Sequence, residues 1–385
     1  MFVDIDAFQH KKHNQNAYGD YFASKRTQGR IIVVLSDGLG SGIKANILSC
    51  MTATMLLKFI EAGYDIQKAC EIIMNSLPVC KVRKISYSTF SAVDCREDGT
   101  ALIAEEGNPK FIWTRKGNIL DTQAYIVTSK IFLNRQMQIY NIKLEPLDRL
   151  IFCSDGATHA GLGTKDLKMG LGRNGVIGFV LNRLCDNPDI SSRELSKSAA
   201  DFALSVEEGK KAKDDISVVS IYMRNPRRAL VFTGPPYRDS QDGFYANAFK
   251  NFNGKKAICG GTTANVISRE LNIPVRSKIL FHSGSLPNLM EMDGVDLVTE
   301  GILTLTRALE YLEYPPYDTP EDAAGRLVKF FLESDCIDFM VGAKFNPSHY
   351  DPSLPVELEI RKNVVKKISK LLEEKYIKKV TLQYI

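Results

Sequence analysis

The chain has 385 residues, which is longer than one ordinary hydrophobic core and predicts two domains. Hydrophobic residues make up 44% of it and charged residues 25%, which excludes a disordered or fibrous protein. The net charge is +5, and the basic residues are scattered among acidic ones, which argues against a nucleic-acid-binding surface. The densest basic run, at 224–228, is interpreted as an exposed linker.

Cysteine usage and the absence of long apolar runs bear on the cellular compartment. The eight cysteines lie mostly in apolar surroundings without any CxxC pair, which favours reduced thiols over disulfides or zinc ligands. The first residues lack the apolar segment of a signal peptide, and no uninterrupted apolar run of about 18 residues predicts a membrane span. We therefore expect a cytoplasmic protein with no membrane partner.

The first predicted elements are a strand followed at once by a helix. Residues 29–38 (GRIIVVLSDG) predict a buried strand that ends in Ser-Asp-Gly. A helix is predicted over 43–62, and Gly63 supplies its left-handed end. Apolar residues recur along it at steps of three and four, so we expect one face to be buried. This stripe consists of Ile43, Ile47, Leu48, Met51, Met55, Leu56 and Phe59.

Further along, short strands and then helices follow. After a second helix at 65–77, strands are predicted at 87–95, 100–106, 110–114, 136–144 and 149–154, with hairpin turns at 97–99 and 116–118. Helices at 174–185 and 192–206 and a strand at 215–223 complete this region. The order predicts an α+β fold over 1–225, in which a β-sandwich is flanked by helices.

The order of predicted strands and helices changes after the polar segment 224–228, which we interpret as a domain boundary. Strands predicted at 229–233, 255–259, 295–298, 336–342 and 378–383 alternate with helices at 241–251, 263–271, 300–313, 320–334 and 357–375. Such alternation is typical of a parallel sheet wound with helices. Residues 228–385 are therefore expected to form a smaller, Rossmann-like α/β domain.

Four acidic residues stand out because each lies beside glycine or another acid, and three of them adjoin apolar strands. They are Asp20, Asp37, Asp155 and Asp214. A carboxylate near a core is costly unless it is paired or binds a cation, so several that converge would form a hard-metal site. Oxygen ligands of this kind suit Mg²⁺ or Mn²⁺ rather than zinc. A single Asp-Gly could equally be a turn, but the repeated pattern favours the metal site.

These segments resemble the protein phosphatase 2C superfamily, in the branch typified by the stage II sporulation protein E phosphatases. The resemblance covers about residues 15–223, and its motifs follow one another in the family's order. They are Tyr-Gly-Asp (18–20), Ser-Asp-Gly-Leu-Gly-Ser-Gly (36–42), Glu-Gly-Asn-Pro (106–109), Leu-Asp-Arg-Leu-Ile-Phe-Cys-Ser-Asp-Gly (147–156) and Asp-Asp-Ile-Ser (214–217).

The resemblance implies a serine/threonine phosphatase that uses two Mn²⁺ or Mg²⁺ ions. It implies that Asp37 bridges the ions with the Gly38 carbonyl, while Asp20, Asp155 and Asp214 complete the metal-binding and catalytic set. Asp215 is then expected to support these ligands. The implied reaction is direct attack of a metal-bound hydroxide on phosphoserine or phosphothreonine, without a covalent phospho-enzyme. The implied partner is a phosphorylated bacterial signalling protein.

Three alternatives stay open at this point. Leu39 occupies the position where many eukaryotic-type members have a histidine as general acid, so the proton could come from water or from His159. The domain could also be a catalytically weak phosphatase fold that acts as a sensor or binding module. A dinucleotide-binding turn at 38–42 is disfavoured because its spacing is GxGxG, and the nearest suitable acid, Glu61, ends a helix.

The second domain offers one candidate ligand site. Its strand at 255–259 runs through Gly260, Gly261, Thr262 and Thr263 into a helix, a layout that could hold a small anion, although an ordinary tight turn has the same sequence. Polar contacts could be added by Asp293, Asp296 and Glu300, or these residues could be solvated. Our hypothesis is that the second domain binds a small ligand or a partner and regulates the first.

Overall fold

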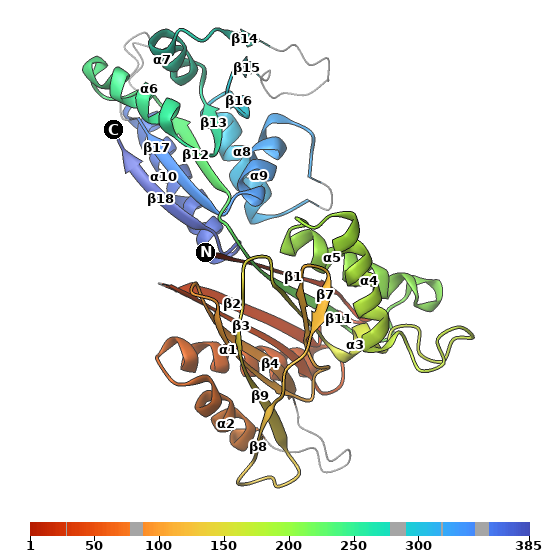
Figure 1. The fold of residues 1–385 in the computed structure, drawn as a ribbon. Coiled ribbons are helices and arrows are strands. Elements are labelled where there is room, and N and C mark those ends of the chain that lie inside the picture. The colour runs from red at the N-terminus through yellow and green to blue at the C-terminus, as the bar shows by residue number, and fades with distance from the viewer. Residues whose placement is uncertain (28, 78–87, 278–289, 317–318, 343–353) are drawn as a thin grey trace. The chain divides into compact units, whose positions relative to one another are not determined.

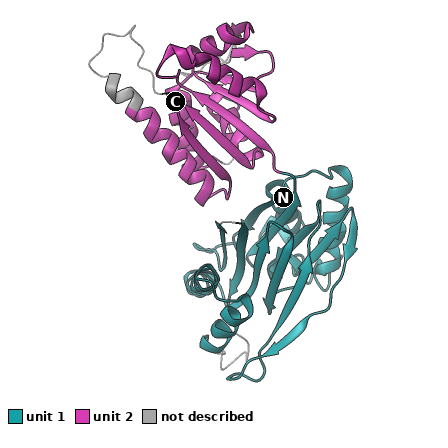
Figure 2. Ribbon diagram, turned by 60° about the vertical axis from the view of Figure 1, so that its left-hand side comes forward, with its two compact units in different colours: residues 1–225 teal, residues 226–385 magenta. Residues whose placement is uncertain are grey.

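The computed structural model describes residues 1–385 except 28, 78–87, 278–289, 317–318 and 343–353. The chain forms two compact units, Met1–Asn225 and Pro226–Ile385 (Figure 2). Cys80 lies outside the described residues, and the seven described cysteines are free thiols.

The first unit is built on two antiparallel sheets (Figure 1). The first sheet has the order β1-β11-β10-β6-β7, and the second has the order β2-β3-β4-β5-β9-β8. The strands of the first sheet are β1 Phe2–His10, β6 Ile112–Arg115, β7 Asn118–Leu120, β10 Arg149–Cys153 and β11 Ile216–Arg224. Those of the second are β2 Asp20–Thr27, β3 Arg30–Gly38, β4 Ser88–Arg96, β5 Thr100–Glu106, β8 Tyr125–Thr128 and β9 Gln136–Lys143.

Helices cover the outer faces of both sheets, and aromatic side chains join the inner faces. Helices α1 Ile43–Glu61 and α2 Ile66–Ser76 pack on the second sheet. Helices α3 Asp155–Thr158, α4 Gly172–Asp186 and α5 Ser192–Ser205 pack on the first, and a short 3₁₀ turn follows at Glu208–Lys210. Between the sheets, the ring of Phe111 lies 5.0 Å from Tyr140 and 5.6 Å from Phe152. The predicted α+β sandwich flanked by helices is confirmed.

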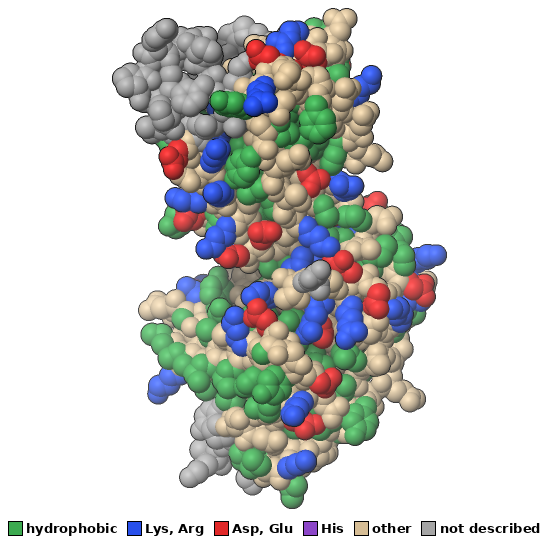
Figure 3. All heavy atoms as spheres, turned by 90° about the vertical axis from the view of Figure 1, so that its left-hand side faces the viewer, with side chains coloured by type: hydrophobic (Ala, Val, Ile, Leu, Met, Phe, Trp, Pro, Cys, Tyr) green, Lys and Arg blue, Asp and Glu red, His purple; other side chains and the backbone are tan. Residues whose placement is uncertain are grey.

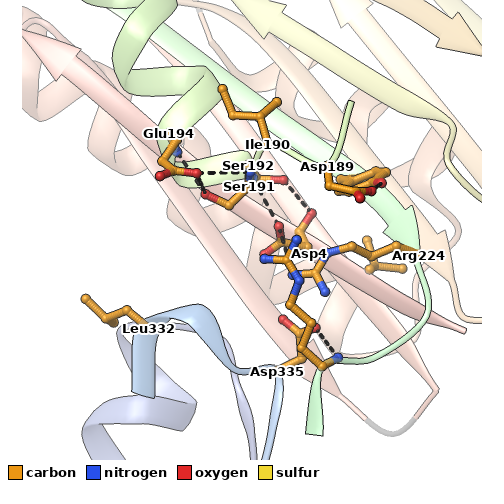
Figure 4. Close-up of polar contacts among 12 residues, drawn as sticks. Asp4, Asp189, Ile190, Ser191, Ser192, Glu194, Arg224, Leu332 and Asp335 are labelled. Atoms are coloured by element: carbon orange, nitrogen blue, oxygen red, sulfur yellow. Dashed lines mark hydrogen bonds and ion pairs between the residues drawn. The ribbon is translucent and has the colours of Figure 1, made fainter. Parts of the chain in front are cut away.

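Strand β1 was not predicted, and polar contacts hold it in the first sheet (Figure 4). The Asp4 carboxylate accepts a 3.0 Å hydrogen bond from the Ser192 backbone N–H, and the Ser192 hydroxyl donates to the Asp4 carbonyl. The Arg224 guanidinium lies 3.4 Å from the same carboxylate. Helix α5 begins with a capping box between Ser191 and Glu194, which fixes the backbone that meets β1.

The predicted buried stripe of α1 is wrong in part. Ile43, Ile47 and Met51 are 66%, 51% and 50% exposed. The helix instead buries mainly small side chains, together with Leu56, Leu57 and Ile60. Among the described residues, α1 is the one helix long and apolar enough to cross a membrane by length and composition, yet its buried side chains pack on the second sheet. The face of the molecule on which α1 lies carries a band of hydrophobic side chains across the first unit (Figure 3).

The second unit is a mostly parallel sheet with the order β14-β15-β16-β13-β12-β17-β18. Its parallel strands are β12 Arg228–Thr233, β13 Lys255–Cys259, β16 Leu297–Thr299, β17 Cys336–Val341 and β18 Lys379–Tyr384. Two short antiparallel strands, β14 Val275–Ser277 and β15 Met290–Met292, extend one edge and were not predicted.

Helices cover both faces of this sheet. A 3₁₀ turn at Asp239–Gln241 leads into α6 Asp242–Asn251, which covers one face together with α7 Gly261–Leu271. Helices α8 Ile302–Glu313, α9 Ala323–Glu333 and α10 Leu354–Glu374 cover the other. Near the start of β12, the Arg227 backbone N–H donates a 2.7 Å hydrogen bond to Asp335 (Figure 4). The predicted α/β architecture of this region is confirmed.

Candidate metal centre

Asp20 and Asp37 lie opposite each other on neighbouring strands of the second sheet. Asp20 is the first residue of β2 and pairs in register with Asp37 near the end of β3. Residues directly opposite in an antiparallel pair place their side chains on the same face, about 5 Å apart. The Ser88 hydroxyl donates a 2.9 Å hydrogen bond to the Asp37 carbonyl and so anchors this strand end. The register alone therefore brings two of the predicted ligands together.

Gly38 follows Asp37 where α1 crosses the strand end. A Cβ atom at position 38 would lie 2.0 Å from the carbonyl oxygen of Ala45, which is backbone that cannot swing away. Glycine is therefore required here by the packing of α1 on β3. The sequence-based reason, close approach of the Gly38 carbonyl to a metal, stays a prediction.

Asp155 and Asp214 come from the first sheet. Asp155 begins α3 and is separated from β10 by Ser154, and Asp214 is separated from β11 by Asp215. A Cβ atom at Gly156 would lie 2.1 Å from the Asp215 carbonyl oxygen and 3.4 Å from the Asp214 Cβ, so the two segments touch. This close contact is the local reason that the two acids share one end of the sheet.

Hydrogen bonds then join the acidic ends of the two sheets. The Ser217 hydroxyl on β11 donates to the Asp20 carboxylate at 2.5 Å. The Asp215 carboxylate accepts hydrogen bonds from the backbone N–H groups of Gly19 at 2.9 Å and Lys12 at 3.1 Å. Asp20, Asp37, Asp155 and Asp214 thus belong to one region, although 194 positions separate the first from the last in the sequence.

Burial and mutual repulsion characterise the carboxylates of this region. Burial raises the pKa of Asp37 above its ordinary value, and the nearby carboxylates of Asp20, Asp155 and Asp214 raise it further. Burial also raises the pKa of Asp20, against the hydrogen bonds from Ser217 and Ser154 that lower it. The pKa of Asp215 is raised chiefly by burial, although its two backbone hydrogen bonds oppose the shift. Within this acidic cluster Asp20 and Asp37 are therefore poorly solvated, whereas the side chains of Asp155 and Asp214 are 44% and 48% exposed.

The donor set fits divalent metal ions, although the side chains do not form a finished coordination shell. In the part of the chain that the structure describes, no three His, Cys, Asp or Glu side chains are arranged as a metal site. The available donors are nevertheless carboxylate oxygens with a backbone carbonyl beside them, which are the ligands of Mg²⁺ and Mn²⁺. Asp20, Asp37, Asp155 and Asp214 would hold such ions, and no metal distance follows from this structure.

Two basic side chains lie beside the cluster. The Lys12 ammonium is 3.6 Å from the Asp214 carboxylate, and the His159 Nδ1 is 3.7 Å from the Asp155 carboxylate. Sequence reasoning considered His159 but missed Lys12, which lies in the loop between two strands that were also missed. It also gave no role to Ser217, although this residue is the serine of the Asp-Asp-Ile-Ser motif.

The Glu-Gly-Asn-Pro motif supports the second sheet rather than contributing ligands. Glu106 forms a buried two-pronged pair with Arg135, with N···O distances of 2.6 and 2.7 Å. Asn108 accepts a 2.7 Å hydrogen bond from the Thr89 hydroxyl, and Thr89 lies opposite Asp37 on β4. The motif therefore fixes the strand next to Asp37.

Comparison with known proteins finds relatives of the first unit. The family model of stage II sporulation protein E (SpoIIE) matches residues 27–224. Stage II sporulation protein E of Bacillus subtilis (strain 168) is 29% identical over 124 residues, which are 32% of this chain and 15% of that protein. The match thus spans less than a sixth of the length of this relative.

Solved structures of phosphatase domains resemble the chain at lower identity. The phosphatase domain of B. subtilis SpoIIE with a fragment of its regulatory domain is 19% identical, with a TM-score of 0.47, and the match covers 58% of this chain and 62% of that one. RsbX in complex with magnesium is also 19% identical, with a TM-score of 0.41 over 57% of this chain and 94% of that one.

The first unit is a phosphatase domain of the protein phosphatase 2C type. Since the family model covers more than half of the sequence, the chain belongs to the stage II sporulation protein E (SpoIIE) family. Proteins of this kind are phosphatases used in signalling.

Proposed function

We propose that the first unit is a metal-dependent protein serine/threonine phosphatase that hydrolyses phosphoserine and phosphothreonine in protein substrates. The observation that carries this proposal is the joining of two acidic strand ends from separate sheets, through Ser217 to Asp20 and through Asp215 to the Gly19 backbone. Membership of a phosphatase family supports the same function.

The proposed roles of the chain's own residues follow from their positions. Asp37 and Asp20 face each other and would hold one side of a pair of Mn²⁺ or Mg²⁺ ions, assisted by the Gly38 carbonyl. Asp155 and Asp214 would hold the other side from the first sheet. Two such ions supply a nucleophilic water near neutral pH and neutralise the phosphoryl oxygens. Ser217 orients Asp20, and Asp215 ties the strand that follows Asp214 to the backbone before Asp20.

The proposed reaction requires no covalent intermediate on the protein. Cys153, which lies in the same motif as Asp155, is buried, and burial raises its thiol pKa to about 12. A thiol held protonated in this way is a poor nucleophile near neutral pH. This supports direct hydrolysis by water over attack by that cysteine.

Hydrolysis of p-nitrophenyl phosphate and of a phosphoserine peptide by the full chain, with and without Mn²⁺, tests the proposal. We expect activity only with Mn²⁺ or Mg²⁺, and a loss of at least about 100-fold in Asp37→Asn, since a ligand shared by two ions is removed. Asp186→Asn is the matched control, because Asp186 is exposed at the end of α4.

Three results would contradict the proposal. They are full activity in the presence of EDTA, an undiminished Asp37→Asn variant, and a wild-type protein that binds Mn²⁺ without hydrolysing either substrate. The last result would instead favour the binding-module alternative.

A further inference from the structure

At the carboxyl ends of the parallel strands in the second unit, polar residues and glycines follow the apolar residues of the core. Thr233 ends β12, Cys259 ends β13 and Thr299 ends β16, and the three are in register with one another. Residues in register on parallel strands project to the same face of the sheet. Cys259 belongs to the core cluster that contains side chains of α8, α9 and α10, so this row lies on the face that those helices cover.

Two helices begin side by side at this edge. Helices α7 and α8 start after Gly260 and Gly301, and neither has a side chain that caps its first N–H groups. A Cβ atom on Gly301 would lie 3.6 Å from the Gly260 Cα, so the two starts are in contact. The partial positive charges of two helix N-termini therefore add at one place, which favours an anion.

Buried polar atoms without partners gather at the same edge. Among the described residues, the Thr233 hydroxyl, the Thr304 hydroxyl and one carboxylate oxygen of Glu300 are buried without a hydrogen-bond partner. Thr233 and Thr304 are both 0% exposed. Helix side chains tilt toward the N-terminus, so Thr304, in the first turn of α8, is directed toward the open end of that helix. Unpaired buried groups are costly, and a bound ligand is one reason for a protein to keep them.

The guanidinium group of Arg361 also lies near this edge. Gly234 follows β12 with a φ of +82°, and a Cβ atom there would lie 2.7 Å from Nη1 of Arg361. The Tyr245 hydroxyl donates a 2.7 Å hydrogen bond to the Gly234 carbonyl and so fixes the loop. The strand order changes direction between β12 and β17, and open α/β sheets bind ligands at the carboxyl side of such a point. Strand β13, after which α7 begins, is the next strand beside β12.

We propose that this edge binds a small phosphorylated sugar or nucleotide. The phosphate lies at the joined starts of α7 and α8, where Gly260 and Gly301 leave the backbone open. The free Glu300 carboxylate oxygen repels a bare phosphate but accepts hydrogen bonds from hydroxyl groups, so it selects a phosphate ester over inorganic phosphate. The Thr304 hydroxyl can donate to the phosphate. This site extends the Gly260–Thr263 segment suggested by the sequence to a second helix and two further strands.

Isothermal titration calorimetry on the full chain tests the site, with ribose 5-phosphate and ADP as probes and EDTA present to remove metal from the first unit. We expect one or both phosphate esters to bind, inorganic phosphate to bind at least about tenfold more weakly, and ribose to give no heat. Thr304→Val should weaken ester binding at least about tenfold, and Glu300→Gln should reduce the preference for the esters over inorganic phosphate, because the charge that repels bare phosphate is gone.

Thr306→Val is the matched control, because the Thr306 hydroxyl on the same helix is already bonded to the Ile302 carbonyl at 2.9 Å. It should bind like wild type. Thr304→Val should fold, since it removes only a hydroxyl without a partner, and circular dichroism checks this. Absence of binding by both esters at millimolar concentration overturns the proposal. Ester binding that is unchanged in Thr304→Val, together with an unchanged preference over inorganic phosphate in Glu300→Gln, overturns it as well, since the esters would then bind elsewhere.

Discussion

The hydroxyl of Ser217 on β11 donates a 2.5 Å hydrogen bond to the carboxylate of Asp20 on β2. The donor belongs to the first sheet and the acceptor to the second, so the bond spans the two layers of the first unit. Gln9 in turn donates a 2.9 Å hydrogen bond to the Ser217 oxygen. A short polar chain therefore sets the orientation of one proposed metal ligand.

Ser217→Ala removes this bond and leaves Asp20 with the hydrogen bond from Ser154, so its carboxylate is held less firmly. Since groups that orient metal ligands typically contribute about 10- to 100-fold to metal affinity or activity, we expect the Mn²⁺ concentration for half-maximal hydrolysis to rise by about that factor. Metal titration of p-nitrophenyl phosphate hydrolysis measures it. Ser220→Ala is the control on the same strand, because the buried Ser220 hydroxyl has no hydrogen-bond partner in the described structure. Equal metal dependence in both variants would contradict the role of Ser217.

The buried pair of Glu106 and Arg135 predicts a large effect on stability. Arg135 is 4% exposed and also donates hydrogen bonds to the carbonyls of Met74 and Leu77 at 2.6 and 2.7 Å. Arg135→Met leaves the Glu106 carboxylate buried and unpaired, so the free energy of unfolding should fall by about 3–5 kcal/mol. Urea unfolding measures this change.

Two further variants separate the pair from a general effect of losing a charge. Replacing Glu106 by Gln in the Arg135→Met background should restore part of the stability, because the unpaired charge is gone. Lys58→Met breaks the exposed pair with Glu61 and should cost less than about 1 kcal/mol. A small loss in Arg135→Met, similar to that in Lys58→Met, would show that the buried pair contributes little.

Glu105 predicts how stability depends on pH. Burial raises the pKa of this carboxyl from 4.5 to about 8, although hydrogen bonds from the Phe111 N–H and the Ser91 hydroxyl oppose the shift. Between these two values the folded protein keeps a proton that the unfolded chain releases. The Glu105 contribution to the free energy of unfolding therefore decreases as pH rises through this window, by at most about 1.4 kcal/mol per pH unit. Glu105→Gln should flatten that slope in urea unfolding series, and an unchanged slope would contradict the assignment.

Elements were predicted correctly from the sequence where the pattern of apolar residues matches the residues that are buried. The prediction was wrong where burial depends on how closely two elements pack. The run at β3 is buried on both faces and was recognised, as were the helices and parallel strands of the second unit. In α1 the large side chains of Ile43, Ile47 and Met51 are exposed, because the small residues Ala45 and Ala53 let the helix approach the sheet closely. Periodicity alone cannot tell whether the buried face of a helix is the one with large apolar side chains or the one with small side chains.

The acidic residues of the candidate site could be named from the sequence, but their supports could not. Strands β1 and β2 carry polar, half-buried residues, so they lack the clear alternation that predicts a strand. The hydrogen bond from Ser217 to Asp20 joins residues 197 positions apart. It forms only because the two sheets pack against each other in one particular alignment. Such contacts follow from tertiary structure rather than from any local pattern.

Gly38 offers the sharpest test of how α1 shapes the site. In Gly38→Ala the new methyl group would lie 2.0 Å from the Ala45 carbonyl oxygen, so α1 must move away from β3. We expect the free energy of unfolding to fall by about 1–3 kcal/mol and hydrolysis to fall as well, since Asp37 adjoins the displaced backbone. Gly178→Ala in the middle of α4 is the matched control, because its methyl group would meet no atom within 4 Å. That variant should gain about 0.5–1 kcal/mol with unchanged activity. If Gly38→Ala matched Gly178→Ala in stability and activity, the close approach of α1 to the strand end would be refuted.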